Sequence, residues 1–280
     1  MKESFTQLLV HLDATPQAAH RLAAARAIAA SHGAAVTALY AVTPAMLEIP
    51  FAVDSGPNAA SVLMEVDRDR RGSAKKALDR ANASEGPEVS WAETSGFPLV
   101  SGFSGQALYA DLMVLGQHDA SDHAFDGVAA DFVESVLAQS GKPALVLPHH
   151  GESAAIGDTV VIAWKPTREA ARAIAAAMPL LQRARRVHVV SWGDAQEAVD
   201  GARLTLQGHL ARRGVDAQFH HEGGPEPEQV GELLLSRACD LGADLLVMGC
   251  YGHGRAREWV LGGASRTILR SMTLPVVMSH

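Results

Sequence analysis

The chain alternates short apolar runs with longer stretches in which apolar residues recur at helical spacing. In the first half the apolar runs predict buried strands at 8–12, 35–40, 89–93, 112–115 and 144–147. The stretches between them predict helices at 16–31, 61–83, 98–109 and 128–139, with a loop at the Pro-containing segment 44–60. Because strands alternate with helices, the pattern predicts parallel pairing with right-handed crossovers.

The second half repeats this order of elements. Its apolar runs predict strands at 159–163, 187–191, 216–220, 244–248 and 275–278. Its helices are expected at 167–182, 195–213, 226–241 and 264–271.

A repeated segment indicates that the two halves are copies of one unit. The segments Ala110–Gly116 and Ala243–Gly249 are identical at five of seven positions. A proline begins the last strand 27 residues after Gly116 and 26 residues after Gly249. The sequence therefore predicts two tandem α/β domains, 1–150 and 151–280, each an open twisted sheet of five parallel strands flanked by helices, as in Rossmann-like folds.

Composition narrows the class of partners. The formal net charge of −7 argues against non-specific binding to nucleic acid or anionic membranes, which requires a basic face. No apolar run reaches the roughly 18 residues needed to span a bilayer, and the first residues lack a signal-peptide layout. Two cysteines do not suggest a disulfide framework. We therefore expect a soluble cytoplasmic protein.

Glycines follow the fourth strand of the second half. That strand is expected to end at Met248. It is followed by Gly249 and then by His253, which stands between Gly252 and Gly254. A second pair, Gly262 and Gly263, precedes Ala264 and Ser265, where a helix is predicted. Glycines let backbone approach a bulky anion, and a helix N-terminus offers unpaired N–H groups. We interpret this segment as a phosphate-binding loop; the alternative is an ordinary β–α connection with turn glycines.

The expected position in the sheet supports the same interpretation. Ligands of open parallel sheets bind beyond the carboxyl ends of strands, where the strand order reverses. Ala163, Trp164 and Lys165 end the first strand of the second half, and Trp192 ends the second strand. We expect these residues to complete a binding site with the glycine loop, with Trp192 either lining the base or packing between the halves.

A spacing of Gly-x2-Gly-x9-Gly in such a unit resembles the universal stress protein family. The resemblance covers nearly the whole chain, as a tandem pair. The family places Ser or Thr after the last glycine, where this chain has Gly263, with Ser265 two residues on. The resemblance implies binding of ATP or ADP with little or no turnover, dimerisation, and induction under stress.

The two halves differ at the positions that the resemblance assigns to nucleotide. Asp13 matches the family's aspartate at the end of the first strand. The loop after Gly116 lacks a second glycine, however, and the following helix start holds Asp131 and Glu134. Two carboxylates there would repel a phosphate. We therefore predict that the first half does not bind nucleotide in the family manner and serves as a scaffold or holds a different ligand.

The second half has Trp164 and Lys165 where the family's aspartate would stand. In one interpretation Lys165 extends over the phosphates as a point charge and Trp164 packs near the base. In the other the site has drifted and Lys165 is a solvated loop residue. Loss of the carboxylate removes a ligand for Mg²⁺, so the sequence does not favour a metal-dependent site.

Three functions remain open at this stage. The first is an ATP- or ADP-binding stress sensor, forming a homodimer and acting on unidentified protein partners. The second is a protein-interaction scaffold that binds no nucleotide. The third is a slow ATPase in which His253 orients a water. No hydrolase triad or Walker A motif is present, and the histidine pairs at 149–150 and 220–221 do not predict a metal site. Cys250 is a further candidate for redox chemistry if the nearby helix N-terminus lowers its thiol pKa.

Overall fold

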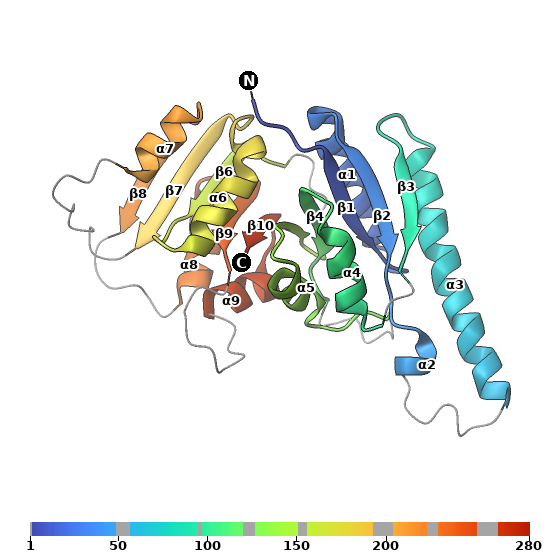
Figure 1. The fold of residues 1–280 in the computed structure, drawn as a ribbon. Helices are drawn as coiled ribbons and strands as arrows, with labels where there is room; N and C mark the ends of the chain where they lie inside the picture. Colours follow the sequence, from blue (N-terminus) through green and yellow to red (C-terminus); the bar gives the residue numbers. More distant parts are fainter. Residues whose placement is uncertain are drawn as a thin grey trace. The chain divides into compact units, whose positions relative to one another are not determined.

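The computed structural model describes residues 2–48, 57–94, 97–119, 127–150, 156–192, 204–222, 229–250 and 263–280, without the side chains of residues 57 and 58. The chain divides into two compact units. The first unit is Ser4–His149, and the second is His150–His280 together with Met1–Glu3. Each unit is an α/β sheet flanked by helices (Figure 1). This confirms the predicted fold class.

The first unit contains five strands and five helices among its described residues. Its strands are β1 (Gln7–Leu12), β2 (Ala35–Tyr40), β3 (Val89–Glu93), β4 (Leu112–Gly116) and β5 (Ala144–Leu147). Its helices are α1 (Ala18–His32), α2 (Ala45–Glu48), α3 (Pro57–Asn82), α4 (Leu99–Ala107) and α5 (Phe132–Ser140). The strands pair in parallel in the order β3-β2-β1-β4-β5.

The second unit repeats this arrangement. Its strands are β6 (Thr159–Ala163), β7 (Arg186–Trp192), β8 (Gln218–Glu222), β9 (Leu245–Gly249) and β10 (Val276–Ser279). Its described helices are α6 (Arg168–Leu181), α7 (Leu206–Arg212), α8 (Val230–Asp240) and α9 (Gly263–Ser271). The parallel order is β10-β9-β6-β7-β8, which is the order of the first unit with each strand replaced by its repeat.

Several predicted boundaries are wrong. The helix expected at 128–139, for example, is α5 at Phe132–Ser140. The segment 44–60 was expected to be loop, but it contains α2 and the first turn of α3, since prolines are tolerated at a helix start. The third strand of the second unit lies two residues later than predicted, at Gln218–Glu222. Within the described part of 195–213, the helix begins only at Leu206, because the Thr205 hydroxyl caps it by accepting the Gly208 N–H.

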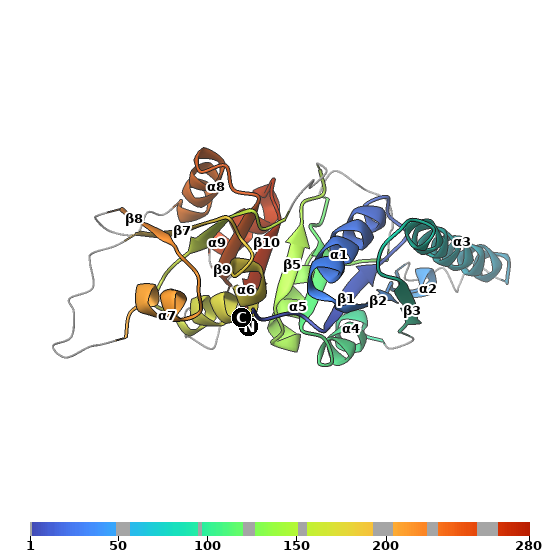
Figure 2. The same cartoon turned by 90° about the horizontal axis from the view of Figure 1, so that it is seen from above.

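Helices cover both faces of each sheet. In the first unit α1 and α3 lie on one face and α4 and α5 on the other; in the second unit α6 and α7 lie opposite α8 and α9 (Figure 2). The central strands are therefore buried on both faces, and Leu8–Leu12 and Leu112–Leu115 are buried runs that are apolar apart from His11. Burial on both faces explains why the sequences of the central strands are continuously hydrophobic and do not alternate between polar and apolar residues.

The repeated Asp of the Ala-Asp-Leu motif has a structural role. The Asp244 carboxylate accepts the backbone N–H groups of Gly157, Asp158 and Thr159, at 3.0, 3.0 and 3.1 Å. Its counterpart Asp111 accepts from the start of β1 in the same way. Each aspartate thus ties the start of the fourth strand of its unit to the start of the first, which accounts for one identity in the repeat without any role in binding.

Both sheets reverse their strand order at the same place. In each unit the chain adds strands to one side of the first strand and then crosses to the other side, so the reversal lies between β1 and β4, and between β6 and β9. Parallel strands end at one edge, and ligands of such sheets bind beyond that edge at the reversal. The structure therefore provides two equivalent candidate positions, one in each unit.

Candidate functional site

The candidate residues of the second unit lie at its strand reversal. Ala163 ends β6 and is the register partner of Met248 on β9, so the two strands end side by side. Trp164 and Lys165 follow β6, and the Trp164 N–H donates to the Val190 carbonyl at 2.8 Å. Met248 is buried, and the other residues are partly exposed at the strand ends. This brings the ends of the first and fourth strands together, as expected from the sequence.

The helix after β6 begins immediately beyond Lys165. The Thr167 N–H donates to the Lys165 carbonyl at 2.7 Å, and the Thr167 hydroxyl caps α6 by accepting the Ala170 N–H at 3.3 Å. The cap fixes the turn that carries Lys165. Trp192 lies one strand further along the sheet, at the end of β7, and is partly exposed there. The contact of Trp192 with the base of a nucleotide stays a prediction.

Gly249 has a packing role that the sequence did not reveal. A Cβ at Gly249 would lie 2.5 Å from the Ala170 nitrogen and 2.6 Å from the Glu169 carbonyl carbon. The first turn of α6 therefore packs directly on the end of β9, and only glycine permits that approach. This glycine is required by the fold whether or not a ligand binds above it.

Glu169 is a carboxylate that the sequence analysis missed at this site. Its side chain is buried beside Gly249, on the first turn of α6, and pairs with the guanidinium of Arg168. Burial alone would raise the pKa of Glu169, but the hydrogen bond from Arg168 and a backbone N–H hold that pKa below its usual value. A position in the first turn of a predicted helix was the available signal, since acidic residues there complement the helix dipole.

Cys250 does not support redox chemistry. The residue is fully buried, its N–H donates to the Ser279 carbonyl at 2.9 Å, and burial, followed by the nearby Glu169 charge, raises the pKa of its thiol to about 12. A thiol with a raised pKa is a poor nucleophile at neutral pH. The lowered thiol pKa considered from the sequence is therefore wrong.

Helix α9 begins at Gly263, at the far end of the predicted loop. Gly263 is exposed, Ala264 is partly exposed and Ser265 is buried at 4% exposure. A Cβ at Gly263 would meet no atom within 4 Å, so packing does not require this glycine. The remaining predicted site residues, Gly252, His253, Gly254 and Gly262, lie outside the described residues.

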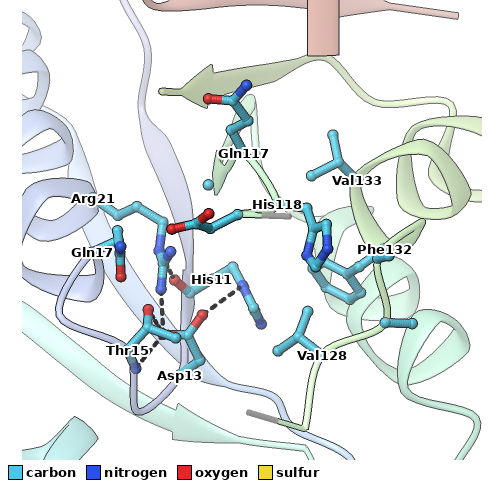
Figure 3. A pocket seen from close by; sticks show the side chains of 14 residues that line it. His11, Asp13, Thr15, Gln17, Arg21, Gln117, His118, Val128, Phe132 and Val133 are labelled. Carbon is cyan, nitrogen blue, oxygen red and sulfur yellow. Dashed lines mark hydrogen bonds and ion pairs between the residues drawn. The ribbon is translucent and has the colours of Figure 1, made fainter. Parts of the chain in front are cut away.

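The equivalent position in the first unit holds a small cavity. It has a volume of about 50 Å³ and opens at the carboxyl ends of β1 and β4 (Figure 3). Asp13, Thr15 and Arg21 line one side of it, and Val128 and Phe132 line the other. Ligand pockets for drug-sized molecules are about 300–1,000 Å³. The cavity is therefore far smaller than a nucleotide site.

A buried ion pair forms the floor of this cavity. Arg21 of α1 places one terminal nitrogen 2.6 Å from Asp13 Oδ1, while its Nε donates to the His11 carbonyl at 2.9 Å. Asp13 Oδ1 also accepts the N–H and the hydroxyl of Thr15, at 2.9 and 2.6 Å. Burial would raise the pKa of Asp13, but Arg21, His11 and Thr15 together hold it below its usual value.

Arg21 also occupies the space beside Gly116. A Cβ at Gly116 would lie 2.5 Å from an Arg21 terminal nitrogen. The internal cation thus satisfies Asp13 from within the protein. Asp13, Asp131 and Glu134 lie where the sequence predicts them, with Asp131 at the N-cap of α5 and Glu134 in its first turn. The role of Arg21 was not predicted, because an arginine among alanines in a helix has the pattern of a solvated residue.

His11 is the other buried group of the cavity floor. Its Nε2 lies 2.8 Å from the Ala41 carbonyl, and its ring packs against Phe103 and Phe132 at centroid distances of 5.5 and 4.5 Å. Burial lowers the pKa of His11 to about 4, although Asp13 opposes the shift. A buried neutral imidazole therefore lies one residue before the end of the first strand of this unit, where its repeat has Ala163.

Neighbouring histidines of the two pairs contact different residues and do not converge on one point. On β8, His220 contacts His188 on one side, and the next residue, His221, contacts Ser191. His149 contacts Gln117 of the first unit. No group of three or more metal-ligating side chains occurs among the residues that the structure describes.

Comparison with solved structures identifies the fold. The chain is similar to a universal stress protein from Archaeoglobus fulgidus DSM 4304, with 16% identity, a TM-score of 0.70, and coverage of 98% of this chain and 97% of the other. It is also similar to a putative universal stress protein from Pseudomonas aeruginosa UCBPP-PA14, with 15% identity, a TM-score of 0.60, and coverage of 98% and 93%. A functionally unknown protein from Pseudomonas aeruginosa PAO1 matches with 14% identity, a TM-score of 0.59, and coverage of 98% and 92%.

Sequence comparison adds no closer relative: no protein-family model and no curated protein matches the chain. The full-length structural matches show that the chain has the tandem universal stress protein fold, as its repeat predicts. Among the described residues, no helix combines the length and the apolar character needed to cross a membrane.

Proposed function

We propose that this chain is a tandem universal stress protein that binds ATP or ADP in its second unit and acts as a nucleotide-linked sensor. The observation that carries the proposal is the position of its candidate residues. Lys165 follows β6, and the glycine segment begins at Gly249, the last residue of β9, at the point where the strand order reverses. Sheets of this type bind ligands there.

The chemistry of the position suits a polyphosphate. Lys165 supplies a cation, and α9 begins with backbone N–H groups that no earlier helical turn satisfies. In this proposal the segment Gly249–Gly254 and the residues Gly262–Ser265 bind the phosphates, while Trp164 and Trp192 lie toward the base. The first unit does not share this role, because Arg21 already satisfies Asp13 and the cavity there is too small.

A sensor suits these groups better than a fast catalyst. The residues assigned to the site supply a cation and backbone donors, which bind phosphate but do not by themselves activate a nucleophile. His253 is the residue to which a slow hydrolysis would be assigned. The proposed location is the cytoplasm, and a homodimer and protein partners are proposed from the family resemblance.

One observation favours a second function. Glu169 places a carboxylate beside Gly249, at the edge where the phosphates would lie. A carboxylate near a polyphosphate is repulsive unless its own cation accompanies it, and Arg168 is that cation here. The alternative is therefore a protein-interaction scaffold without bound nucleotide.

Calorimetric titration of nucleotide-free protein with ATP separates the two functions. We expect one site per chain in the wild type and no binding in Gly252→Val. The matched control is Asp119→Val, which changes the corresponding position of the first unit and leaves binding intact. Lys165→Ala should weaken binding by about tenfold, a loss of one favourable charge contact.

The same titration with and without Mg²⁺ tests whether Lys165 replaces the metal. Affinity independent of Mg²⁺ is expected, and a strong Mg²⁺ requirement contradicts that role of Lys165. Absence of binding at millimolar ATP establishes the scaffold instead. Phosphate release that disappears in His253→Ala while binding persists would identify a slow ATPase.

A further inference from the structure

A pair of histidines joins the outermost strand of the second unit to its neighbour. Strand β8 ends the strand order of its unit and pairs with β7. Four of its five residues are exposed, and His220 is partly buried. His220 Nε2 lies 3.1 Å from Nδ1 of His188 on β7, and His188 is buried at 5% exposure. Because β8 buries so little surface, it belongs to the least stable part of the unit, and this contact is a substantial part of its attachment.

Arg237 of α8 determines which ring nitrogens carry the protons. A guanidinium only donates, so its Nη2, at 3.5 Å from His220 Nδ1, requires a lone pair on that nitrogen. The single proton of a neutral His220 ring is then on Nε2, which donates to His188 Nδ1. One chain of polar contacts therefore runs from α8 through β8 to β7, and it requires both rings to be neutral.

A second proton on either ring occupies a nitrogen that accepts in the neutral state. On His220 the proton is added at Nδ1, against the guanidinium of Arg237. On His188 it is added at Nδ1, against the N–H group of His220. Each event replaces an accepted hydrogen bond by two opposed donors and places a positive charge among donors. Movement of β8 away from β7 and α8 relieves that repulsion.

The other charged groups around the pair increase the repulsion. Arg186 lies two positions before His188 on the same face of β7, and Arg237 approaches from α8. On the far side of β7, strand β6 places the apolar Val161 opposite His188. Burial, followed by the charges of His220, Arg186 and Arg237, lowers the pKa of His188.

Carboxylates on the same elements do not offset this charge. Glu222 shares a face of β8 with His220, and Asp240 lies three positions after Arg237 on α8; both are exposed. Within the described part of the unit, neither forms an ion pair with the two histidines or with Arg237. His188 Nε2 and Arg237 Nε are also buried there without an acceptor. A water would satisfy these N–H groups but would not neutralise an added proton.

We propose that the His188–His220 pair makes the attachment of β8 sensitive to acid, so that protonation of either ring releases this edge strand from β7 and α8. The folded pKa of His188 lies below the value of 6.5 expected for an unfolded chain. The attachment is therefore complete above pH 6.5 and weakens as the pH falls below it. Release uncovers the backbone edge of β7, whose N–H and C=O groups can then pair with another extended segment. This property is independent of nucleotide binding.

Hydrogen exchange of the full chain between about pH 7.5 and about pH 5 tests the proposal. Rates for peptides covering β8 are divided by the chemical exchange rate at each pH, which leaves the opening equilibrium. We expect opening of β8 to increase by up to about tenfold per pH unit below pH 6.5, as uptake of one proton requires. Peptides covering β6 should keep their protection, because a local opening leaves the central strands folded.

Two adjacent histidines supply a matched pair of variants. His220→Gln should remove most of the increase, because a glutamine amide can either donate to His188 or accept from its protonated ring. His221→Gln should retain the increase, because His221 contacts Ser191 and not His188.

Arg237→Gln tests the same contact if His220→Gln leaves β8 unprotected at every pH. Loss of the neighbouring cation makes protonation of His220 in the folded protein less unfavourable. The increase should then end at a higher pH, and its total should be smaller by about threefold or more.

The proposal is overturned if opening of β8 is constant across this pH range. It also fails if His220→Gln keeps the whole increase, or if His221→Gln loses it, because the effect would then belong to another group. Equal acceleration at β6 would show that the whole unit unfolds instead. None of these results bears on ATP binding, which is measured at neutral pH, so the two proposals fail separately.

Discussion

The two units place different groups at the same position of one topology. In the first unit the Arg21 side chain lies against Gly116, and in the second the backbone of α6 lies against Gly249. The repeat explains the difference, because Arg21 corresponds to Ala173. Without a long side chain at that position, the helix start itself approaches the strand end.

The same comparison extends to the ligands that each position can accept. The first unit has a buried ion pair and a neutral histidine at the end of its first strand. The second has Ala163 and a partly exposed Lys165 in the corresponding places. A few substitutions at strand ends have thus produced two chemically distinct positions on one scaffold, which is why binding must be argued for each unit separately.

The largest expected effect is at the two equivalent glycines. Gly249→Ala should destabilise the second unit by about 3 kcal/mol, because the new Cβ meets helix backbone that cannot move alone. Gly116→Ala should cost about 1 kcal/mol, since the group it meets is the flexible end of Arg21. Hydrogen exchange of peptides covering β9 and β4 measures the two costs within one chain. Equal costs would show that the units pack alike at this point.

A pH-dependent effect should distinguish the first unit. The pKa of His11 is about 4 in the folded protein and 6.5 in the unfolded chain, so between these values the unfolded chain binds more protons. The first unit should therefore lose up to about 3 kcal/mol of stability as the pH falls from 6.5 to 4. Exchange at β1 measured across this range should show the loss.

The variant His11→Phe removes the titrating group and should remove most of that loss. Peptides covering β6 provide the internal control, because the corresponding residue there is Ala163. An unchanged pH dependence of β1 in His11→Phe would assign the acid sensitivity to another group.

A smaller difference is expected between the two aspartates that join strand starts. Asp244→Ala should destabilise the second unit by about 2 kcal/mol, because three backbone N–H groups lose a charged acceptor. Asp111→Ala should cost about 1 kcal/mol, since Asp111 is exposed and water replaces part of the interaction. Urea unfolding of the two variants gives the values. A larger cost for Asp111→Ala would contradict this reading of their burial.

Local patterns were sufficient for most of the fold. Runs such as Leu112–Leu115 contain only apolar residues, as expected for a strand that is buried on both faces of a parallel sheet. Their assignment as strands therefore needs no tertiary information. The weakest predictions were at segments whose signals conflict. Prolines in 44–60 suggested loop, yet a proline also suits the first turn of a helix, as at Pro57.

Some residues of the candidate sites could likewise be predicted from the sequence, and others could not. The sequence led to the ends of β6 and β9 and to Asp13, because residue type and position in a repeat are visible without a structure. Arg21, Glu169 and His11 were not recognised, because their importance depends on partners far away in the chain. Arg21 contacts Gly116 only after α1 packs on the sheet, and His11 meets Ala41 only when β1 and β2 align.

By itself, the sequence determined the order of strands and helices, the duplication of the unit and the position of the glycine segment, because each depends on residue type and short spacing. Only the tertiary structure decided that Asp13 is satisfied internally, that Glu169 lies beside Gly249, and that His220 contacts His188 across two strands. Those outcomes depend on burial and on contacts between distant segments, which change the protonation and the available hydrogen bonds of groups that look ordinary in the sequence.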